Sequence, residues 1–196
     1  MALTLWAKSP PKTETRESLN LDCTETLTGY PLLPHLLDVA AVAAKLQKII
    51  PPPVDSHCSE EWISSLVGLH DLGKATPGFQ KKLGLDFCAA AAPDRHDAST
   101  IPLLKRQLEK IGVTKQVARQ LAMAVGAHHG SLITSIDIHA ASRWQFEPDW
   151  LATHEELFEN LLVCIEAQGI PELPSDGLDD WFGRQLNGWT SHPVLT

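Results

Sequence analysis

The stretch Leu69-His70-Asp71-Leu72-Gly73-Lys74 places a histidine and an aspartate side by side, with a lysine three residues after the aspartate. It lies at the end of a helix predicted over 60–72, on which Ile63, Val67 and His70 share an apolar face. Adjacent side chains on a helix point about 100° apart, but at the end of a helix a metal ion can lie between them. A His-Asp pair by itself is more often a surface or capping pair, so its meaning depends on the rest of the chain.

Four further histidines accompany this pair. His35 begins the first predicted helix, His96 follows a loop, and His128-His129 ends a helix predicted over 115–128. One histidine on an apolar face is usually a core residue with its hydrogen bonds satisfied. Several of them together with an aspartate, on four segments that can converge in a bundle, favour a shared metal site instead. Neutral imidazole is a good ligand for transition metals, and bundle interiors are where such sites are built.

The rest of the chain also has a helical pattern. Apolar residues at helical spacing predict further helices over 34–47, 96–111 and 155–168, and a short one over 178–186. Prolines at 51–53 end the first of these helices. We expect residues 1–30 to form an irregular arm, and no segment has a clear strand period. The sequence therefore predicts an all-α fold, a compact helical bundle, with residues 1–196 in a single domain.

Charge and composition exclude some classes of protein. The chain has 196 residues and a net charge of −8, which argues against a broad basic surface that grips nucleic acid. If DNA is the substrate, the metal site or a partner must supply much of the attraction. No apolar run reaches the length of a membrane span and no signal-peptide pattern is present, so we expect a cytoplasmic protein without a membrane partner. None of the four cysteines forms a C-x-x-C pair, which excludes a zinc ribbon or a redox motif of that kind.

The order of these residues resembles the HD superfamily of metal-dependent phosphohydrolases, and most of all the HD nuclease domain of the CRISPR-associated type I helicase-nuclease. The matching motifs, in chain order, are Trp6-Ala-Lys-Ser9, His35-Leu-Leu-Asp-Val-Ala-Ala-Val-Ala43, His70-Asp-Leu-Gly-Lys74 followed by Phe79-Gln80, His96-Asp-Ala98, Val125-Gly-Ala-His-His-Gly130 and Ser142-Arg-Trp144. The His-Asp element occurs in many HD proteins. The double histidine combined with the first-helix motif is far more specific to the nuclease group.

The resemblance implies an HD-type bundle with a site for one or two divalent ions. It makes His35, His70 and Asp71 the ligands of one ion. Asp71 would also bridge to a second ion, whose other ligands would be His96, His128 and His129. Lys74 would lie near the scissile phosphate. The histidine-rich ligand set favours manganese, iron, cobalt or nickel over magnesium, which prefers oxygen ligands.

The implied activity is cleavage of single-stranded DNA in CRISPR interference, an antiviral defence. The implied partners are a helicase domain or subunit and the CRISPR surveillance complex. Two other functions remain open on the sequence alone. One is an HD phosphohydrolase that acts on nucleotides or cyclic nucleotides, which the negative charge suits somewhat better. The other is a non-catalytic HD module that only binds a helicase partner.

One family element departs from the expected pattern. The family carries a further aspartate in an Ala-Asp-Trp-Leu-Gly-Ser-like segment on a late helix. Leu178-Asp-Asp-Trp-Phe-Gly183 is similar and offers Asp180, but it comes early, so we favour a chain that stops before the true element. In that case the first ion would be weakly held or absent.

Supporting roles are also expected for several other residues. Asp38 and Asp97 are candidates to orient the rings of His35 and His96, and Asp97 is alternatively a helix cap. Trp144 and Phe146 are expected in the core, with base stacking as the alternative. The histidines without a motif are expected at the surface; they are His57, His139, His154 and His192.

Overall fold

The all-α fold predicted from the sequence is confirmed by the computed structural model, which describes residues 5–8, 29–50, 58–83, 95–130, 133–143 and 148–171. The α-helices, in chain order, are α2 (Leu32–Ile49), α3 (Glu60–Gly68), α4 (Pro77–Lys82), α5 (His96–Lys110), α6 (Lys115–Gly126), α7 (Ser135–Arg143) and α8 (Pro148–Ile165). Two 3-10 helices, η1 (Leu69–Lys74) and η2 (Ala127–His129), directly follow α3 and α6. None of the described helices is long and apolar enough to cross a membrane.

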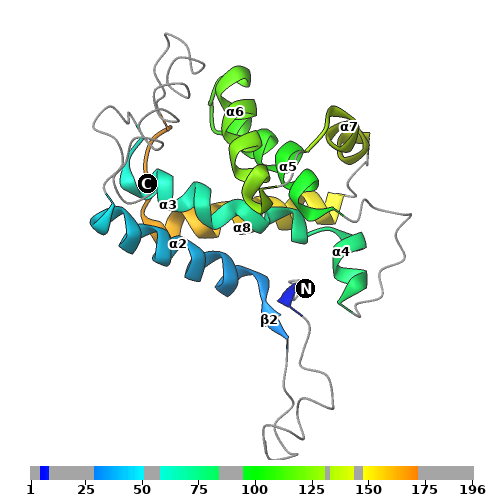
Figure 1. The fold of residues 1–196 in the computed structure, drawn as a ribbon, viewed down its shortest axis with the longest axis horizontal. Coiled ribbons are helices and arrows are strands. Elements are labelled where there is room, and N and C mark those ends of the chain that lie inside the picture. The colour runs from blue at the N-terminus through cyan, green and yellow to red at the C-terminus, as the bar shows by residue number, and fades with distance from the viewer. Residues whose placement is uncertain are drawn as a thin grey trace, which may run out of the picture.

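The helices form two groups that meet at η1. Helix α2 packs against α3, and α8 packs against both, while α5 packs against α6, α7 and η1. Figure 1 shows α2 and α3 side by side, with α5 and α6 on the far side of α3 from α2. A continuous core that includes Trp62, Leu69, Leu104 and Phe158 joins the two groups. Because η1 lies between them, it can bring side chains from both groups together.

The N-terminal segment differs from the irregular arm that the sequence predicts. Strand β1 (Trp6–Lys8) pairs antiparallel with the two-residue strand β2 (Tyr30–Pro31). The backbone N–H of Leu32 also donates to the carbonyl of Leu5 at 2.8 Å. A three-residue strand is too short to show a period of two, which is why the sequence pattern does not reveal it.

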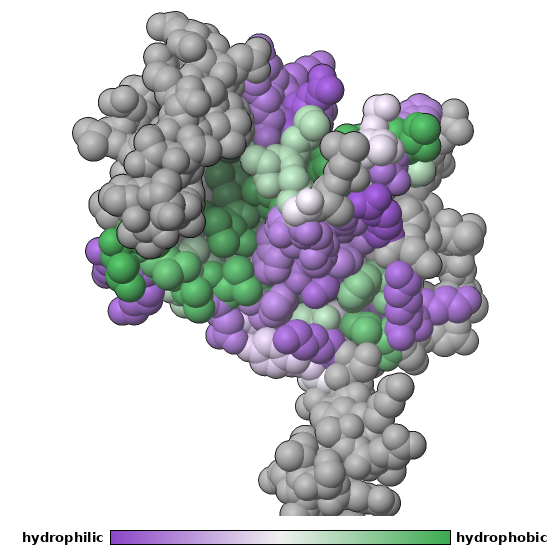
Figure 2. All heavy atoms as spheres, viewed as in Figure 1, coloured by the Kyte–Doolittle hydropathy of each residue, from purple (hydrophilic) through white to green (hydrophobic). Residues whose placement is uncertain are grey.

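Several helix bounds and faces also differ from expectation. Helix α8 begins at Pro148, seven residues before the predicted start at 155, and the predicted helices 60–72 and 115–128 each end in a 3-10 turn. The predicted apolar face of α3 lies partly in solvent, since Val67 is 42% exposed, whereas Trp62 and Leu66 face the core. Both faces of α3 carry apolar residues, so periodicity alone did not identify the buried one. Figure 2 shows hydrophobic residues exposed over α2 and a hydrophilic area beside them at the centre of this face.

Candidate metal centre

The carboxylate of Asp71 is the centre of the site. Its Oδ2 atom lies 2.8 Å from Nε2 of His35, 3.1 Å from Nε2 of His70 and 2.6 Å from Nζ of Lys74. Its Oδ1 atom lies 3.1 Å from Nε2 of His96 and 3.6 Å from Nε2 of His128. The Asp71 side chain is only 4% exposed. Four imidazoles and one ammonium therefore surround a single buried carboxylate.

The 3-10 turn η1 sets the position of this carboxylate. Asp71 departs from helical geometry, with φ −100° and ψ 16°, so the chain bends at the aspartate. The bend places Asp71 inward, beside His70, rather than continuing the regular course of α3. The sequence predicted the aspartate at a helix end but not the change to a 3-10 turn.

Close packing between η1 and α5 brings His96 to Asp71. A Cβ atom built on Gly73 would lie 1.9 Å from the carbonyl oxygen of His96, so only glycine fits at position 73. The Gly73 N–H donates to Oγ1 of Thr100 at 2.9 Å, and that hydroxyl lies 3.0 Å from the carbonyl oxygens of His70 and His96. The role of Gly73 is therefore to let η1 and α5 pack this closely.

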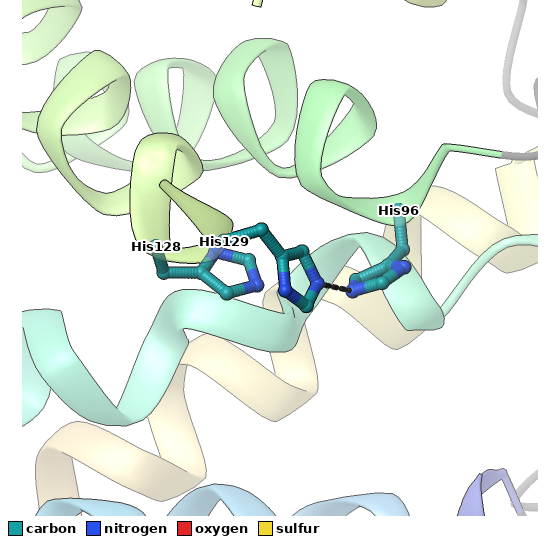
Figure 3. Close-up of side chains that lie close together, drawn as sticks. All are labelled: His96, His128 and His129. Atoms are coloured by element: carbon teal, nitrogen blue, oxygen red, sulfur yellow. Dashed lines mark hydrogen bonds between the residues drawn. The ribbon is translucent and has the colours of Figure 1, made fainter. Parts of the chain in front are cut away.

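A second close contact places the double histidine. A Cβ atom on Gly126 would lie 2.4 Å from Cγ1 of Ile101, so the end of α6 lies directly on α5. The turn η2 follows at once and carries His128 and His129 toward His96 (Figure 3). Gly130 ends the turn in the left-handed conformation, with φ 66°. The Nε2 atoms of His129 and His96 lie 2.9 Å apart.

These contacts create two groups of possible ligands. In one group, His35, His70 and Asp71 have ligand atoms that all lie within 4.8 Å of one another. The other group, His96, His128 and His129, meets the same limit. The residues that the family resemblance implies as ligands therefore come together, and Asp71 belongs to the first group and also faces the second.

Hydrogen bonds from Nδ1 to the backbone leave the Nε2 atoms of His70 and His128 available for a metal ion. Nδ1 of His70 lies 3.1 Å from the carbonyl oxygen of Val67, and Nδ1 of His128 lies 3.0 Å from that of Val125. A carbonyl only accepts, so both Nδ1 atoms carry the proton and both Nε2 atoms keep a lone pair for a metal. Two buried atoms, Nε2 of His128 and Oδ1 of Asp71, have no hydrogen bond in the described part of the chain. Buried polar atoms without partners are rare, and a metal ion would satisfy both.

A family model described as "Cas3, HD domain" matches residues 6–191. The chain belongs to this family.

Relatives and solved structures agree with this assignment. The CRISPR-associated endonuclease/helicase Cas3 of Thermus thermophilus is 32% identical over 204 residues, which cover 90% of this chain and 20% of that protein. The chain thus spans about a fifth of that relative's length. The crystal structure of the Thermus thermophilus Cas3 HD domain in the presence of Ni²⁺ is 31% identical, with a TM-score of 0.58 over 81% of this chain and 70% of that one. The crystal structure of T. fusca Cas3 shares the fold at 20% identity, with a TM-score of 0.59 over 97% of this chain and 24% of that one.

The pKa shifts in this Cas3 HD domain favour the deprotonated form of several candidate ligands. Burial alone would raise the pKa of the Asp71 carboxyl, but hydrogen bonds from the surrounding imidazoles in their protonated form, and from the Lys74 ammonium, hold that pKa far below its usual range. Burial lowers the pKa of His35 despite the neighbouring Asp71 carboxylate, and burial beside His128 lowers the pKa of His129. The Asp71 carboxylate raises the pKa of His128. Because ligands must be deprotonated, the lowered pKa values of Asp71, His35 and His129 suit metal binding near neutral pH.

The lysine of the motif is part of the same cluster. Nζ of Lys74 is 2.6 Å from Oδ2 of Asp71 and 5.6 Å from the centre of the Phe79 ring. The Phe79 ring in turn contacts His96 edge-on, with 5.1 Å between ring centroids. Lys74 is therefore held inside the site by the Asp71 carboxylate and the Phe79 ring.

The expected supporting roles of Asp38 and Asp97 differ from what the structure has. Asp38 accepts a hydrogen bond from the Tyr30 hydroxyl instead of facing His35. Asp97 is buried and pairs with Arg95 at 2.7 Å. Burial would raise the pKa of Asp97, but hydrogen bonds from Arg95 and the Ala98 backbone lower it to about 2. Arg95 also reaches Asp137 on α7, at 3.2 Å, so Asp97 helps tie the start of α5 to α7.

The expectation for the isolated histidines was wrong for His154. His139 is exposed as expected, but His154 is completely buried and donates to the carbonyl oxygen of Ala75. The signal was present in the sequence, because Trp150, His154, Leu157 and Leu161 repeat at helical spacing along α8. His57, Trp144, Phe146, Asp180 and His192 lie outside the described residues. The family match runs through residue 191, so it includes the segment with Asp180.

Proposed function

We propose that this chain is a metal-dependent nuclease domain that hydrolyses phosphodiester bonds in single-stranded DNA during CRISPR interference. The observation that carries the proposal is the Asp71 carboxylate, which belongs to one group of possible ligands with His35 and His70. Its Oδ1 atom faces His96 and His128 of the other group, at 3.1 and 3.6 Å. A carboxylate in that position can bridge two cations. Phosphoryl transfer benefits from such a pair, because both the attacking and the leaving oxygen need charge stabilisation.

The ligand set indicates a transition metal. Five imidazoles and one carboxylate suit manganese, iron, cobalt or nickel better than magnesium. The Thermus thermophilus Cas3 HD domain was crystallised in the presence of Ni²⁺, which is consistent with this choice. When bound, such ions polarise the phosphoryl oxygens and make an attacking water more acidic. In this chain His35, His70 and Asp71 would hold one ion, and His96, His128 and His129, with Asp71, would hold the other.

The protein's own groups have separate roles. The backbone carbonyls of Val67 and Val125 fix the rings of His70 and His128 with Nε2 toward the site. Lys74 is the cation positioned to stabilise the negative charge that builds on the phosphate, since its ammonium lies beside Asp71. Its partner carboxylate is buried, so little water competes for the ammonium.

The substrate and partners follow from charge and from the relatives. A net charge of −8 gives the domain no general attraction for DNA, so a strand must be delivered to the site. The Thermus thermophilus relative is an endonuclease and a helicase, and the present chain corresponds to about a fifth of it. We infer that a helicase, in the same or a separate chain, feeds a single strand to this domain. A CRISPR surveillance complex would recruit the two to the target.

The test uses a circular single-stranded DNA, which reports cleavage inside a strand without free ends. The chain is stripped of metal and incubated with Mn²⁺, Co²⁺, Ni²⁺ or Mg²⁺ in turn. We expect cleavage with a transition metal and loss of cleavage in Asp71→Asn. His139→Ala is the matched control, because His139 is an exposed histidine on α7.

The other outcomes distinguish the competing functions. Bound metal without cleavage of DNA, but with hydrolysis of mononucleotides or cyclic nucleotides, would establish a small-molecule phosphohydrolase. Neither cleavage nor bound metal, in a chain that is folded by circular dichroism, would leave the non-catalytic module.

A further inference from the structure

The carbonyl groups of the last two residues of η1 and of the residue after it are each held by a different buried side chain. Oγ1 of Thr76 donates to the carbonyl of Gly73 at 3.0 Å, and Nε2 of Gln80 donates to that of Lys74 at 2.8 Å. Nε2 of His154, from α8, donates to the carbonyl of Ala75. The donor side chains of Thr76, Gln80 and His154 are all 0% exposed. We call this set the carbonyl clamp.

The carbonyl clamp satisfies backbone carbonyls that have no partner within η1. The last carbonyls of a helix have no partner within the helix, and most are satisfied by water or by a following turn. Here the end of η1 is buried, so an unpaired carbonyl would lose its hydration without compensation. The donors that satisfy these carbonyls are polar side chains from α4, from α8 and from the loop between η1 and α4. They fix the direction in which the chain leaves the turn.

Gln80 extends the clamp to the N-terminal strand. Its Oε1 atom accepts from the Trp6 N–H at 2.9 Å, and its Nε2 atom donates to the Trp6 carbonyl at 2.9 Å. The side-chain amide therefore pairs with both backbone groups of Trp6, as a neighbouring strand would. Strand β1 is thus connected through one side chain to the backbone of Lys74.

The backbone that the clamp holds carries the lysine of the site. The Lys74 side chain reaches Asp71 at 2.6 Å and lies over the Phe79 ring. A shift of its carbonyl would move the ammonium relative to the carboxylate, because the two are only three residues apart. We propose that Thr76, Gln80 and His154 are positioning residues that hold Lys74 against Asp71. Their effect on cleavage rests on the function proposed above, but their effect on Lys74 does not.

The test follows the Lys74 ammonium directly. An ammonium held in a buried ion pair gives a ¹H–¹⁵N signal from Nζ that exposed lysines lose to exchange with water, and Lys74→Met identifies it. In Gln80→Met and His154→Leu, which remove donors and keep side-chain volume, we expect this signal to shift or broaden. In His154→Gln, which retains a donor at a similar reach, we expect it to return. On DNA, the first two variants should lower kcat by roughly tenfold to a hundredfold with little change in KM.

A matched control separates positioning from loss of stability. Gln47 is also a buried glutamine, whose Nε2 donates to the carbonyl of Glu60 at 3.1 Å and to Oγ of Ser64 at 2.7 Å, away from η1. Gln47→Met should lower the melting temperature and leave the Lys74 signal unchanged. An unchanged Lys74 signal in folded Gln80→Met and His154→Leu would overturn the inference. Absence of nuclease activity in the wild-type chain would instead overturn the proposed function, and the Lys74 signal would still decide the role of the clamp.

Discussion

The Nε2 atoms of His96 and His129 face each other at 2.9 Å, although 33 residues separate them in the sequence. Two lone pairs directed at one another repel, so a proton or a cation must lie between or beside them. Burial and the neighbouring imidazoles lower the pKa of His129, but a neutral imidazole still carries one N–H, so one of the two rings can donate to the other in the metal-free protein. With that N–H moved to Nδ1, both Nε2 atoms would face a metal ion that the two rings contact.

The His129→Ala variant tests this interpretation. Removing one ring from the group of His96, His128 and His129 leaves too few ligands for tight binding, so the metal retained after dialysis should fall by one ion per chain. Elemental analysis gives the count, and His139→Ala should retain the wild-type amount. Equal metal content in both variants would show that His129 is not a ligand.

A second prediction concerns Lys74, whose ammonium both assists the proposed reaction and competes with a metal for Asp71. Lys74→Met should lower kcat by roughly 10²- to 10³-fold, as loss of a charge-stabilising group does. It should bind Mn²⁺ as tightly as the wild type or more tightly, because a positive charge next to the ligand is gone. Calorimetric titration together with cleavage assays separates these effects. Lys105→Met, which removes a half-buried lysine that pairs with Glu109 on α5, is the control. Weaker metal binding in Lys74→Met would contradict the prediction.

The residues named from the sequence do come together, because motif residues carry strong local signals, and their role as metal ligands stays a prediction. The helix predicted over 96–111 is observed as His96–Lys110, and the four histidine segments do converge on Asp71. The side chains that support them were missed. Thr100 and Gln80 bind backbone groups far away in the sequence, and no periodic pattern reports a hydrogen bond of that kind.

Errors in burial have a different physical origin. Helix α3 has apolar residues on two faces, and only tertiary packing decided that Trp62, not Val67, would face the core. His154 was assigned to the surface because histidine is a poor guide to burial, although its apolar neighbours on α8 indicated the core. For His154 the residue type outweighed the pattern of its neighbours, whereas for α3 the pattern itself allowed two buried faces.

The close approach of η1 to α5 gives a third prediction. Gly73→Ala would place a Cβ atom 1.9 Å from a backbone oxygen, so the two elements must separate. Overpacking of this kind typically costs about 1–3 kcal/mol, and backbone contacts belong at the upper end. Gly126→Ala meets mainly the Ile101 side chain, which can move, and should cost less. Urea denaturation gives the order, and an equal or reversed order would show that η1 and α5 are not packed this closely.

A fourth prediction concerns Asp180, in the segment that is similar to the late family element. The family match includes residues 178–183, and the group of His35, His70 and Asp71 offers fewer ligands than the six that manganese or nickel commonly takes. If Asp180 belongs to the family element, Asp180→Asn should weaken Mn²⁺ binding by at least about tenfold, in line with the loss of a coordinating group. Asp179→Asn changes the same charge one residue away and should bind as the wild type does. Equal effects of the two variants would exclude a specific role for Asp180.

The last prediction uses the buried His154. Burial lowers the pKa of this ring to about 4, against an ordinary value of 6.5. His154 is protonated below about pH 6.5 in the unfolded chain, but only below about pH 4 in the folded chain. Protonation therefore favours the unfolded chain, and the free energy of unfolding falls as the pH drops from 6.5 to 4. The loss at pH 4 should be on the order of 3 kcal/mol from this one group. His154→Gln has no ring to titrate and keeps a donor for Ala75, so its unfolding free energy should fall less between pH 6.5 and pH 4. Chemical denaturation at the two pH values, compared between variant and wild type, isolates the contribution, and identical pH dependence in both would mean that His154 does not resist protonation in the fold.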